Sequence, residues 1–127
     1  MKFARWVFLI AGIYGVLALA PMYFQEAMVA QTRPPAITHA EYYYGFIGVA
    51  LAWQVLFLQL SRDPQRHRPL MIPAILEKAG FGFAMLALYA QHRLSNLMLA
   101  AGVVDLLFVI LFALAYRRTR NTMVPAG

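Results

Sequence analysis

The sequence predicts an all-α, antiparallel four-helix transmembrane bundle with both termini in the cytoplasm. Hydrophobic residues make up 62% of the 127 residues, charged residues make up only 13%, and the mean hydropathy is +0.62. A soluble domain has about 45–50% apolar and about 25% charged residues, and a short chain buries only part of its surface. Lipid is therefore the solvent that fits this composition, and residues 1–127 are expected to form a single transmembrane domain.

Four apolar runs are long enough to cross a membrane as helices. A span needs about 20 apolar residues, and the backbone inside lipid must bond to itself, which favours helices. Apolar and polar residues do not alternate with a period of two, which argues against a barrel. The expected spans cover about residues 6–24, 42–60, 70–89 and 97–116.

The first run has a second interpretation, as a cleaved signal peptide. Lys2 and Arg5 would form its basic region, and Ala18-Leu19-Ala20 would form a cleavage site of small residues. However, Pro21 would directly follow the cut, where it is unfavourable, and the apolar run continues to Phe24. The sequence therefore favours a first span.

Polar links that contain helix-breaking residues separate the runs. In the first link, Arg33-Pro34-Pro35 predicts a stiff turn that no helix continues through. Thr38 and Glu41 have the spacing of a capping box that would open the second helix. Ser95 or Asn96 is expected to cap the fourth helix.

The distribution of basic residues predicts the orientation, because Lys and Arg are enriched in cytoplasmic links. One side of the expected spans has only Arg33 and Arg93, beside Glu26 and Glu41. The other side has Lys2, Arg5, Arg62, Arg66, Arg68, Arg117, Arg118 and Arg120. This bias predicts a multi-pass protein of the bacterial cytoplasmic (inner) membrane, with both termini and the second link in the cytoplasm.

Four polar side chains within the expected spans are candidates for a functional site. A charged group at the bilayer centre costs about 2.5–3.5 kcal/mol on insertion scales, so its presence needs a reason. Counted from the cytoplasmic ends of their spans, Gln54 lies at about 9 Å and Glu77 and Lys78 at about 11 Å. Asp105 lies at about 16 Å. Antiparallel packing of the second and third spans would place Gln54, Glu77 and Lys78 in one layer, with Asp105 about one turn further out.

These residues predict a polar pocket that opens toward the cytoplasm and binds protons or a substrate. A structural interpretation is also open, in which Lys78 pairs with Glu77 or Asp105 or extends to the inner interface, and Gln54 bonds neighbouring helices. Adjacent helical residues point about 100° apart, so a Lys78–Asp105 bridge with Glu77 left free is compatible with the geometry. The expected ligand-binding residues are Glu77, Asp105, Lys78, Gln54, Trp53 and Tyr14.

Several function classes are disfavoured. Cysteine is absent, so no disulfide, thiolate metal site or cysteine nucleophile can form. His39, His67 and His92 are far apart in the sequence and lack metal-ligand spacing, so neither a metal nor another cofactor is expected. The net charge of +6 is compatible with nucleic acid, but the basic residues lie between apolar runs, so no nucleic-acid partner is expected.

The expected partners belong to the membrane. Besides the lipid bilayer itself, anionic lipid headgroups can contact Arg62, Arg66 and Arg68 in the second link, although topology alone also explains these arginines. Small residues such as Gly82 and Gly102 permit close packing of the third and fourth spans. A homodimer or a larger membrane complex would shield the polar pocket, which four short helices shield poorly.

Two stretches resemble a known group of proteins. They are residues 43–54, YYGFIGVALAWQ, and residues 62–64, RDP, followed by residues 68–78, RPLMIPAILEK. Together they resemble small uncharacterised bacterial four-span membrane proteins of the DoxX-like kind. The resemblance covers the second and third spans, under half of the chain. It implies the fold and the location and transfers no catalytic residue.

The sequence supports three hypotheses for function. The first is a binding or transport-related protein that holds a small amphiphilic or proton-coupled ligand at Glu77 and Asp105. The second is an intramembrane enzyme in which these carboxyls form an acid/base pair acting on a lipid-like substrate, which resembles sterol isomerases of four or five spans. The third is an accessory subunit of a larger membrane complex. Small multidrug transporters also have four spans but rely on a glutamate in the first, where this chain has no acid before Glu26.

Overall fold

The computed structural model describes residues 2–119, and in this part of the chain all regular secondary structure is helical, with no strand. Arg120, one of the predicted cytoplasmic basic residues, lies outside the described residues. Within the described residues, four helical stretches are long and apolar enough to cross a membrane: Lys2–Phe24, Ala40–Arg62, Arg68–Ala90 and Asn96–Arg118. The predicted all-α, four-span fold is confirmed, with each stretch slightly longer than the apolar run that predicted it.

The first stretch combines the helix α1 (Lys2–Leu19) with the 3-10 segment η1 (Ala20–Phe24). Pro21 lies in the first turn of η1. Because proline lacks the N–H that an α-helix would require there, the backbone changes to 3-10 geometry at this point. The apolar residues of η1 still extend the stretch to the length of a membrane span.

A short helix, α2 (Glu26–Thr32), lies in the first link and was not predicted. With only seven residues, it is too short to show hydrophobic periodicity. It ends at Thr32, with Arg33 at the C-cap position, as the predicted Arg33-Pro34-Pro35 turn requires. The hydroxyl of Tyr44 donates a 2.8 Å hydrogen bond to the Glu26 carboxylate, which attaches α2 to the second span.

The second span is α3 (Ala40–Arg62), and its predicted capping box is wrong. The N-cap position is His39, one residue after Thr38, and no side chain caps the helix. Glu41 lies beside His39 instead, with 3.8 Å between Oε2 and Nδ1. The box requires Thr38 at the N-cap, so the shift of one residue removes its geometry.

The third and fourth spans form a hairpin. The 3-10 segment η2 (Arg68–Leu70) leads directly into α4 (Met71–Ala90), and a tight turn connects α4 to α5 (Asn96–Arg118). Ser95 is the N-cap of α5, and its hydroxyl accepts a 3.3 Å hydrogen bond from the backbone N–H of Met98. The prediction of a cap at Ser95 or Asn96 is therefore confirmed, with Ser95 as the residue.

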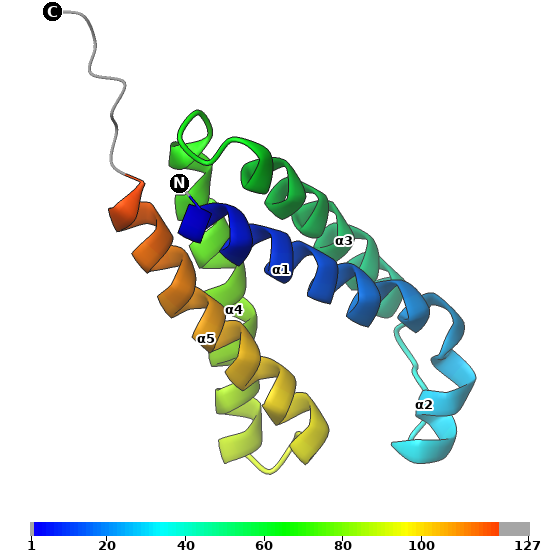
Figure 1. Ribbon diagram of the computed structural model, residues 1–127. Helices are drawn as coiled ribbons and strands as arrows, with labels where there is room; N and C mark the ends of the chain where they lie inside the picture. Colours follow the sequence, from blue (N-terminus) through cyan, green and yellow to red (C-terminus); the bar gives the residue numbers. More distant parts are fainter. Residues whose placement is uncertain (1, 120–127) are drawn as a thin grey trace, which may run out of the picture.

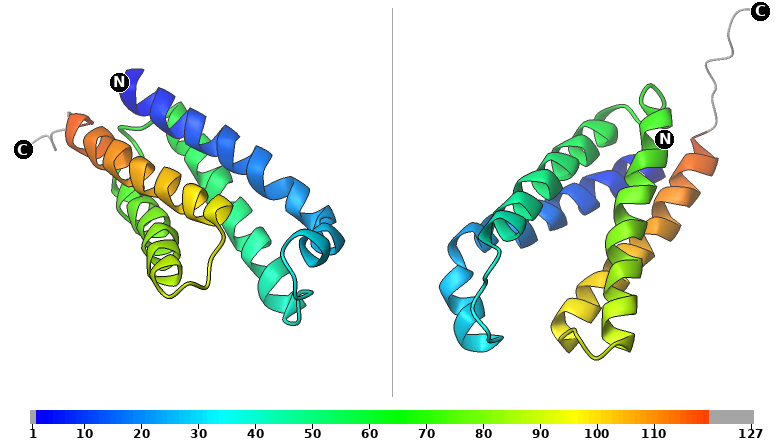
Figure 2. Two further views of the ribbon diagram at one scale, coloured as in Figure 1. Left: turned by 90° about the horizontal axis from the view of Figure 1, so that it is seen from below. Right: turned by 180° about the vertical axis from the view of Figure 1, so that it is seen from behind.

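The four long helices are arranged as two hairpins. Helix α1 packs along α3, α4 packs along α5, and α1 also contacts α5, whereas α3 and α4 make few contacts. Figure 1 and Figure 2 show that the hairpins meet at the end that holds the N-terminus, the end of α5 and the α3–α4 link. They diverge toward the end that holds α2 and the α4–α5 turn. The bundle is therefore packed at one end and splayed at the other.

An aromatic core joins the hairpins at the packed end. The rings of Phe8, Phe57 and Phe112 come from α1, α3 and α5, and all three are fully buried. Ring centroids are 4.3 Å apart for Phe8 and Phe112 and 5.2 Å apart for Phe57 and Phe112. The full buried cluster comprises Ala4, Val7, Phe8, Ala11, Phe57, Leu60, Met71, Ala74, Phe108, Phe112 and Ala115.

The outer surface of the bundle is apolar. Large hydrophobic side chains such as Leu17, Leu76 and Ile110 are more than half exposed, at 70%, 66% and 58%. A soluble protein rarely exposes apolar area this extensively, whereas lipid solvates it. The four apolar stretches and this surface identify a multi-pass membrane protein.

Glycines allow the two helices of each hairpin to approach closely. A Cβ added to Gly82 of α4 would lie 2.6 Å from Cγ of Leu106 and 3.1 Å from the carbonyl oxygen of Gly102, both on α5. In the other hairpin, a Cβ on Gly12 of α1 would lie 2.7 Å from the side chain of Leu58. Small residues at these crossings bring the backbones together, as is usual for membrane helices.

This packing makes a testable prediction about two nearby glycines of α4. Gly82→Ala should destabilise the protein by about 1–3 kcal/mol, because the new methyl group overlaps α5. Gly80→Ala is the matched control, since a Cβ there meets nothing within 4 Å and should be neutral or stabilising by up to about 1 kcal/mol. The free energy of unfolding in detergent measures both. If both substitutions changed the free energy of unfolding equally, α4 and α5 would not approach each other closely at Gly82.

Candidate functional site

A buried ion pair lies between α4 and α5. The ammonium nitrogen of Lys78 is 3.3 Å from Oδ1 of Asp105 and donates a hydrogen bond to it. The side chains are only 3% and 11% exposed. The structure therefore forms the Lys78–Asp105 bridge that the helical geometry allowed, and Lys78 does not extend to the interface.

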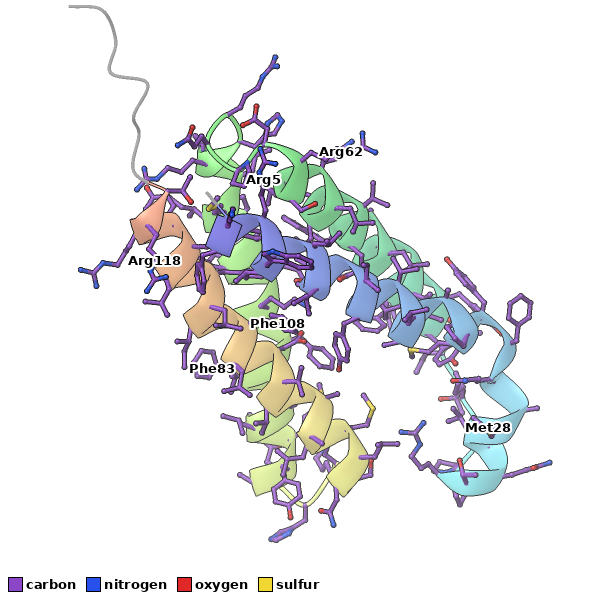
Figure 3. The ribbon with its side chains drawn as sticks, in the orientation of Figure 1. Arg5, Met28, Arg62, Phe83, Phe108 and Arg118 are labelled. Atoms are coloured by element: carbon purple, nitrogen blue, oxygen red, sulfur yellow. The ribbon has the colours of Figure 1, made fainter. Side chains whose placement is uncertain are left out.

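Two aromatic rings enclose the Lys78 ammonium. Its nitrogen lies 5.3 Å from the ring centroid of Phe57 on α3 and 5.3 Å from that of Phe108 on α5. Ring faces attract cations, most strongly where water is excluded. Figure 3 shows Phe108 on the side of α5 that faces the other hairpin. Lys78 thus bonds to Asp105 within its own hairpin, and it also contacts Phe57 of α3 in the other hairpin.

Glu77 is the ionisable group of this cluster that has no partner. Its side chain is partly buried, and Oε2 is inaccessible to solvent and has no hydrogen-bond partner among the described residues. Lys78 and Asp105 both lie within electrostatic reach of it. Because Lys78 already bonds Asp105, Glu77 retains an acceptor that the protein itself does not satisfy.

Gln54 lies in the other hairpin, at the interface between α1 and α3. It is 1% exposed, and its amide nitrogen donates a 2.8 Å hydrogen bond to the carbonyl oxygen of Ala50. Its side chain lies against Gly15 of α1, where any Cβ would overlap it. Helix α3 therefore packs mainly on α1, and it makes few contacts with α4, the neighbour expected from the sequence. The physical reason is that the glycines of α1 provide a closer surface for α3 than α4 does.

Trp53 and Tyr14 each lie next to one of the two rings that enclose the Lys78 ammonium. The ring of Trp53 is 6.5 Å from that of Phe57, and the ring of Tyr14 is 5.9 Å from that of Phe108. Among the predicted ligand-binding residues, Glu77, Lys78 and Asp105 lie together between α4 and α5. Trp53 and Tyr14 lie behind the rings of Phe57 and Phe108, and Gln54 lies at the α1–α3 interface.

Aromatic rings pack on the side of the cluster where the sequence predicts a pocket opening. The buried rings of Phe8, Phe57 and Phe112 occupy the side of the cluster toward the termini. Two surface hollows lie elsewhere. One of about 430 Å³ lies at the end of α5, and one of about 410 Å³ lies beside α2 and is lined by residues that include Tyr23 and Glu26. The polar cluster is thus enclosed by helix packing on the side predicted to be open.

Phe57 and Phe108 contribute to the site and were not predicted. No sequence signal distinguishes them, because phenylalanine is common in apolar spans and only its tertiary contacts show which rings face a cation. In residues 2–119, no three His, Asp or Glu side chains gather closely enough to hold a metal ion.

Comparison of the chain with family models, with curated proteins and with solved structures finds no match. The resemblance of residues 43–54 and 62–78 to DoxX-like proteins therefore stays a prediction. What the site does must be inferred from its own chemistry.

The ion pair predicts a non-additive mutational effect. Lys78→Met or Asp105→Leu alone should destabilise the protein by about 3–5 kcal/mol, because each leaves one buried charge without its partner. The double variant K78M/D105L should recover to within about 1 kcal/mol of the parent, since no buried charge of the pair remains. Unfolding free energies in detergent test this. A double variant as unstable as the sum of the singles would contradict the pairing.

Proposed function

We propose that this protein binds a small amphiphilic ligand, in exchange for a proton, at the cluster of Glu77, Lys78 and Asp105 in the bacterial inner membrane. The observation that carries the proposal is the solvent-inaccessible Oε2 of Glu77, which has no partner among the described residues. Ionisable groups at membrane depth are costly and typically mark ligand or proton sites.

The charge of the cluster indicates the charge of the ligand. Lys78 and Asp105 neutralise each other through their 3.3 Å bridge. Glu77 is then the group that carries unbalanced charge when it is ionised. A carboxylate at this depth requires either a proton or a cation beside it. A cationic amphiphile would satisfy Glu77 and would displace the proton from it.

The same bridge favours binding over the enzyme hypothesis. An acid/base pair needs both carboxyls within reach of the substrate and able to exchange protons with it. Asp105 is held by Lys78 and by its burial in the α4–α5 interface. Of the two carboxyls, Glu77 makes no hydrogen bond or ion pair with the described residues, whereas Asp105 already binds Lys78 through Oδ1.

The proposal is tested with two probes of equal size and opposite charge, tetraphenylphosphonium and tetraphenylborate. The purified protein should bind the cation and release a proton, measured by calorimetry and by the pH change of a weakly buffered solution. Glu77→Gln should abolish proton release and weaken cation binding by roughly tenfold or more, since it removes about 1.5–3 kcal/mol of charge-assisted contact.

Glu41→Gln is the matched control, because Glu41 is exposed at the start of α3 and undergoes the same chemical change. It should bind like the parent. Cation binding that survives in Glu77→Gln would refute the proposal, as would equal binding of the two probes. In that case, recovery of a stoichiometric partner protein from native membranes would favour the accessory-subunit hypothesis.

The proposed orientation, with both termini in the cytoplasm, predicts a labelling pattern. Figure 3 shows Arg5, Arg62 and Arg118 at one end of the molecule, whereas Met28 of α2 is at the other. The chain has no cysteine, so single substitutions report accessibility cleanly. Gln91→Cys, in the α4–α5 turn, should react with an impermeant maleimide on intact spheroplasts. Gln65→Cys, in the α3–α4 link, should react only after permeabilisation. The reverse pattern would invert the orientation.

A further inference from the structure

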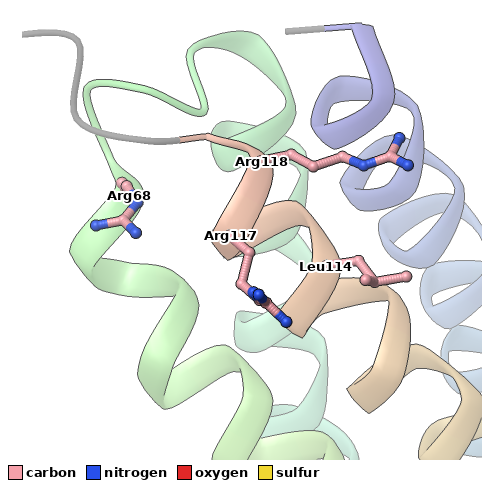
Figure 4. A pocket seen from close by; sticks show the side chains of 4 residues that line it. All are labelled: Arg68, Leu114, Arg117 and Arg118. Carbon is pink, nitrogen blue, oxygen red and sulfur yellow. The ribbon is translucent and has the colours of Figure 1, made fainter.

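We propose that Arg68, Arg117 and Arg118 form a binding site for the phosphate group of an anionic phospholipid. With Leu114 they line a hollow of about 430 Å³ at the end of α5, named here the arginine hollow. Figure 4 shows these side chains around the last turns of α5 and the start of α4. This inference stands apart from the ligand cluster at Glu77, which lies deeper in the helix packing.

The guanidinium of Arg68 is fixed by the end of α5. Its Nε donates a 3.0 Å hydrogen bond to the carbonyl oxygen of Tyr116, and its central carbon lies 3.7 Å from the centroid of the Tyr116 ring. Both contacts use Nε and one face of the group. The terminal nitrogens therefore remain as donors, already ordered, with the planar geometry that suits phosphate oxygens.

The other two arginines add unbalanced positive charge. The guanidinium carbon of Arg118 lies 4.6 Å from the ring centroid of Phe3 on α1, which holds it against the first helix. None of the three arginines forms an ion pair with an acid of the described residues, whose salt bridges are His39–Glu41 and Lys78–Asp105. Three arginines that line one hollow, with no acid among its lining residues, attract an anion.

The lining also indicates that the anion belongs to a lipid. Leu114 lies one turn before Arg118 on α5, toward the membrane-spanning part, so the hollow has a basic end and an apolar end. A phospholipid matches both, with its phosphate at the arginines and an acyl chain along the apolar helix. Free phosphate would match the basic end alone.

The predicted lipid-contacting arginines, Arg62, Arg66 and Arg68, overlap with the proposed site at one residue. Of these, only Arg68 lines the arginine hollow. Arg62 and Arg66 are exposed at the end of α3 and in the α3–α4 link. They therefore provide a matched control, with the same loss of charge at the same end of the molecule.

The test compares the double variants R117Q/R118Q and R62Q/R66Q in nanodiscs of phosphatidylcholine with added phosphatidylglycerol. Native mass spectrometry counts the phosphatidylglycerol retained by the released protein. R117Q/R118Q should lose roughly tenfold in retention, and R62Q/R66Q less than about threefold, since the first pair contacts the bound headgroup. Circular dichroism verifies that both remain helical, and Arg68→Lys should lower retention although it keeps the charge.

A second experiment distinguishes a lipid from free phosphate. Inorganic phosphate is titrated against the detergent-solubilised protein and followed by phosphorus NMR. If the protein retains phosphatidylglycerol but binds no inorganic phosphate over the titrated range, the lipid site is supported. Phosphate that binds alone, with the same dependence on Arg117 and Arg118, would assign the hollow to a soluble anion and overturn the lipid. Equal losses in both double variants, or none, would overturn the site and leave the arginines as topology signals.

Discussion

The buried contact between Lys78 and Asp105 is the interaction on which the middle of the molecule depends. Neither charge is tolerable at this depth alone, because water is absent and lipid offers no counter-charge. The 3.3 Å bridge joins α4 to α5, and the rings of Phe57 and Phe108 enclose the ammonium from two sides. One lysine therefore fixes three helices relative to one another, and it leaves Oε2 of the neighbouring Glu77 without a partner among residues 2–119.

Two kinds of packing hold the bundle together, one within each hairpin and one between the hairpins. Within each hairpin, glycines such as Gly12 and Gly82 bring the backbones close, a contact that does not depend on water. Between the hairpins, large rings such as Phe8 and Phe112 fill the space at the end that holds the termini. The hairpins diverge beyond these rings (Figure 1), so the polar cluster lies where packing between the hairpins gives way to their separation.

The charged groups differ between the packed end of the molecule and the middle of its spans. At the packed end, unpaired arginines such as Arg117 stand where the apolar surface ends, and at mid-span the acids and Lys78 are enclosed. An anion site is compatible with the first position because headgroups and water are near. A site for a proton or a cation is compatible with the second, where Oε2 of Glu77 has no hydrogen-bond partner among the described residues. Both proposed sites therefore follow from the same change of surroundings, from water and headgroups at the end of the helices to hydrocarbon at mid-span.

The sequence by itself determined the class of fold, the positions of the spans within a few residues, the Ser95 cap and the cost of the acids at mid-span. These properties depend on local composition and on the length of a helix in lipid, which a single run of residues specifies. Only the tertiary structure decided that α3 pairs with α1, that Gln54 packs against Gly15, and that the rings of Phe57 and Phe108 enclose the Lys78 ammonium. The reason is that apolar helices are alike as sequences, and only side-chain shape at each crossing selects the neighbour.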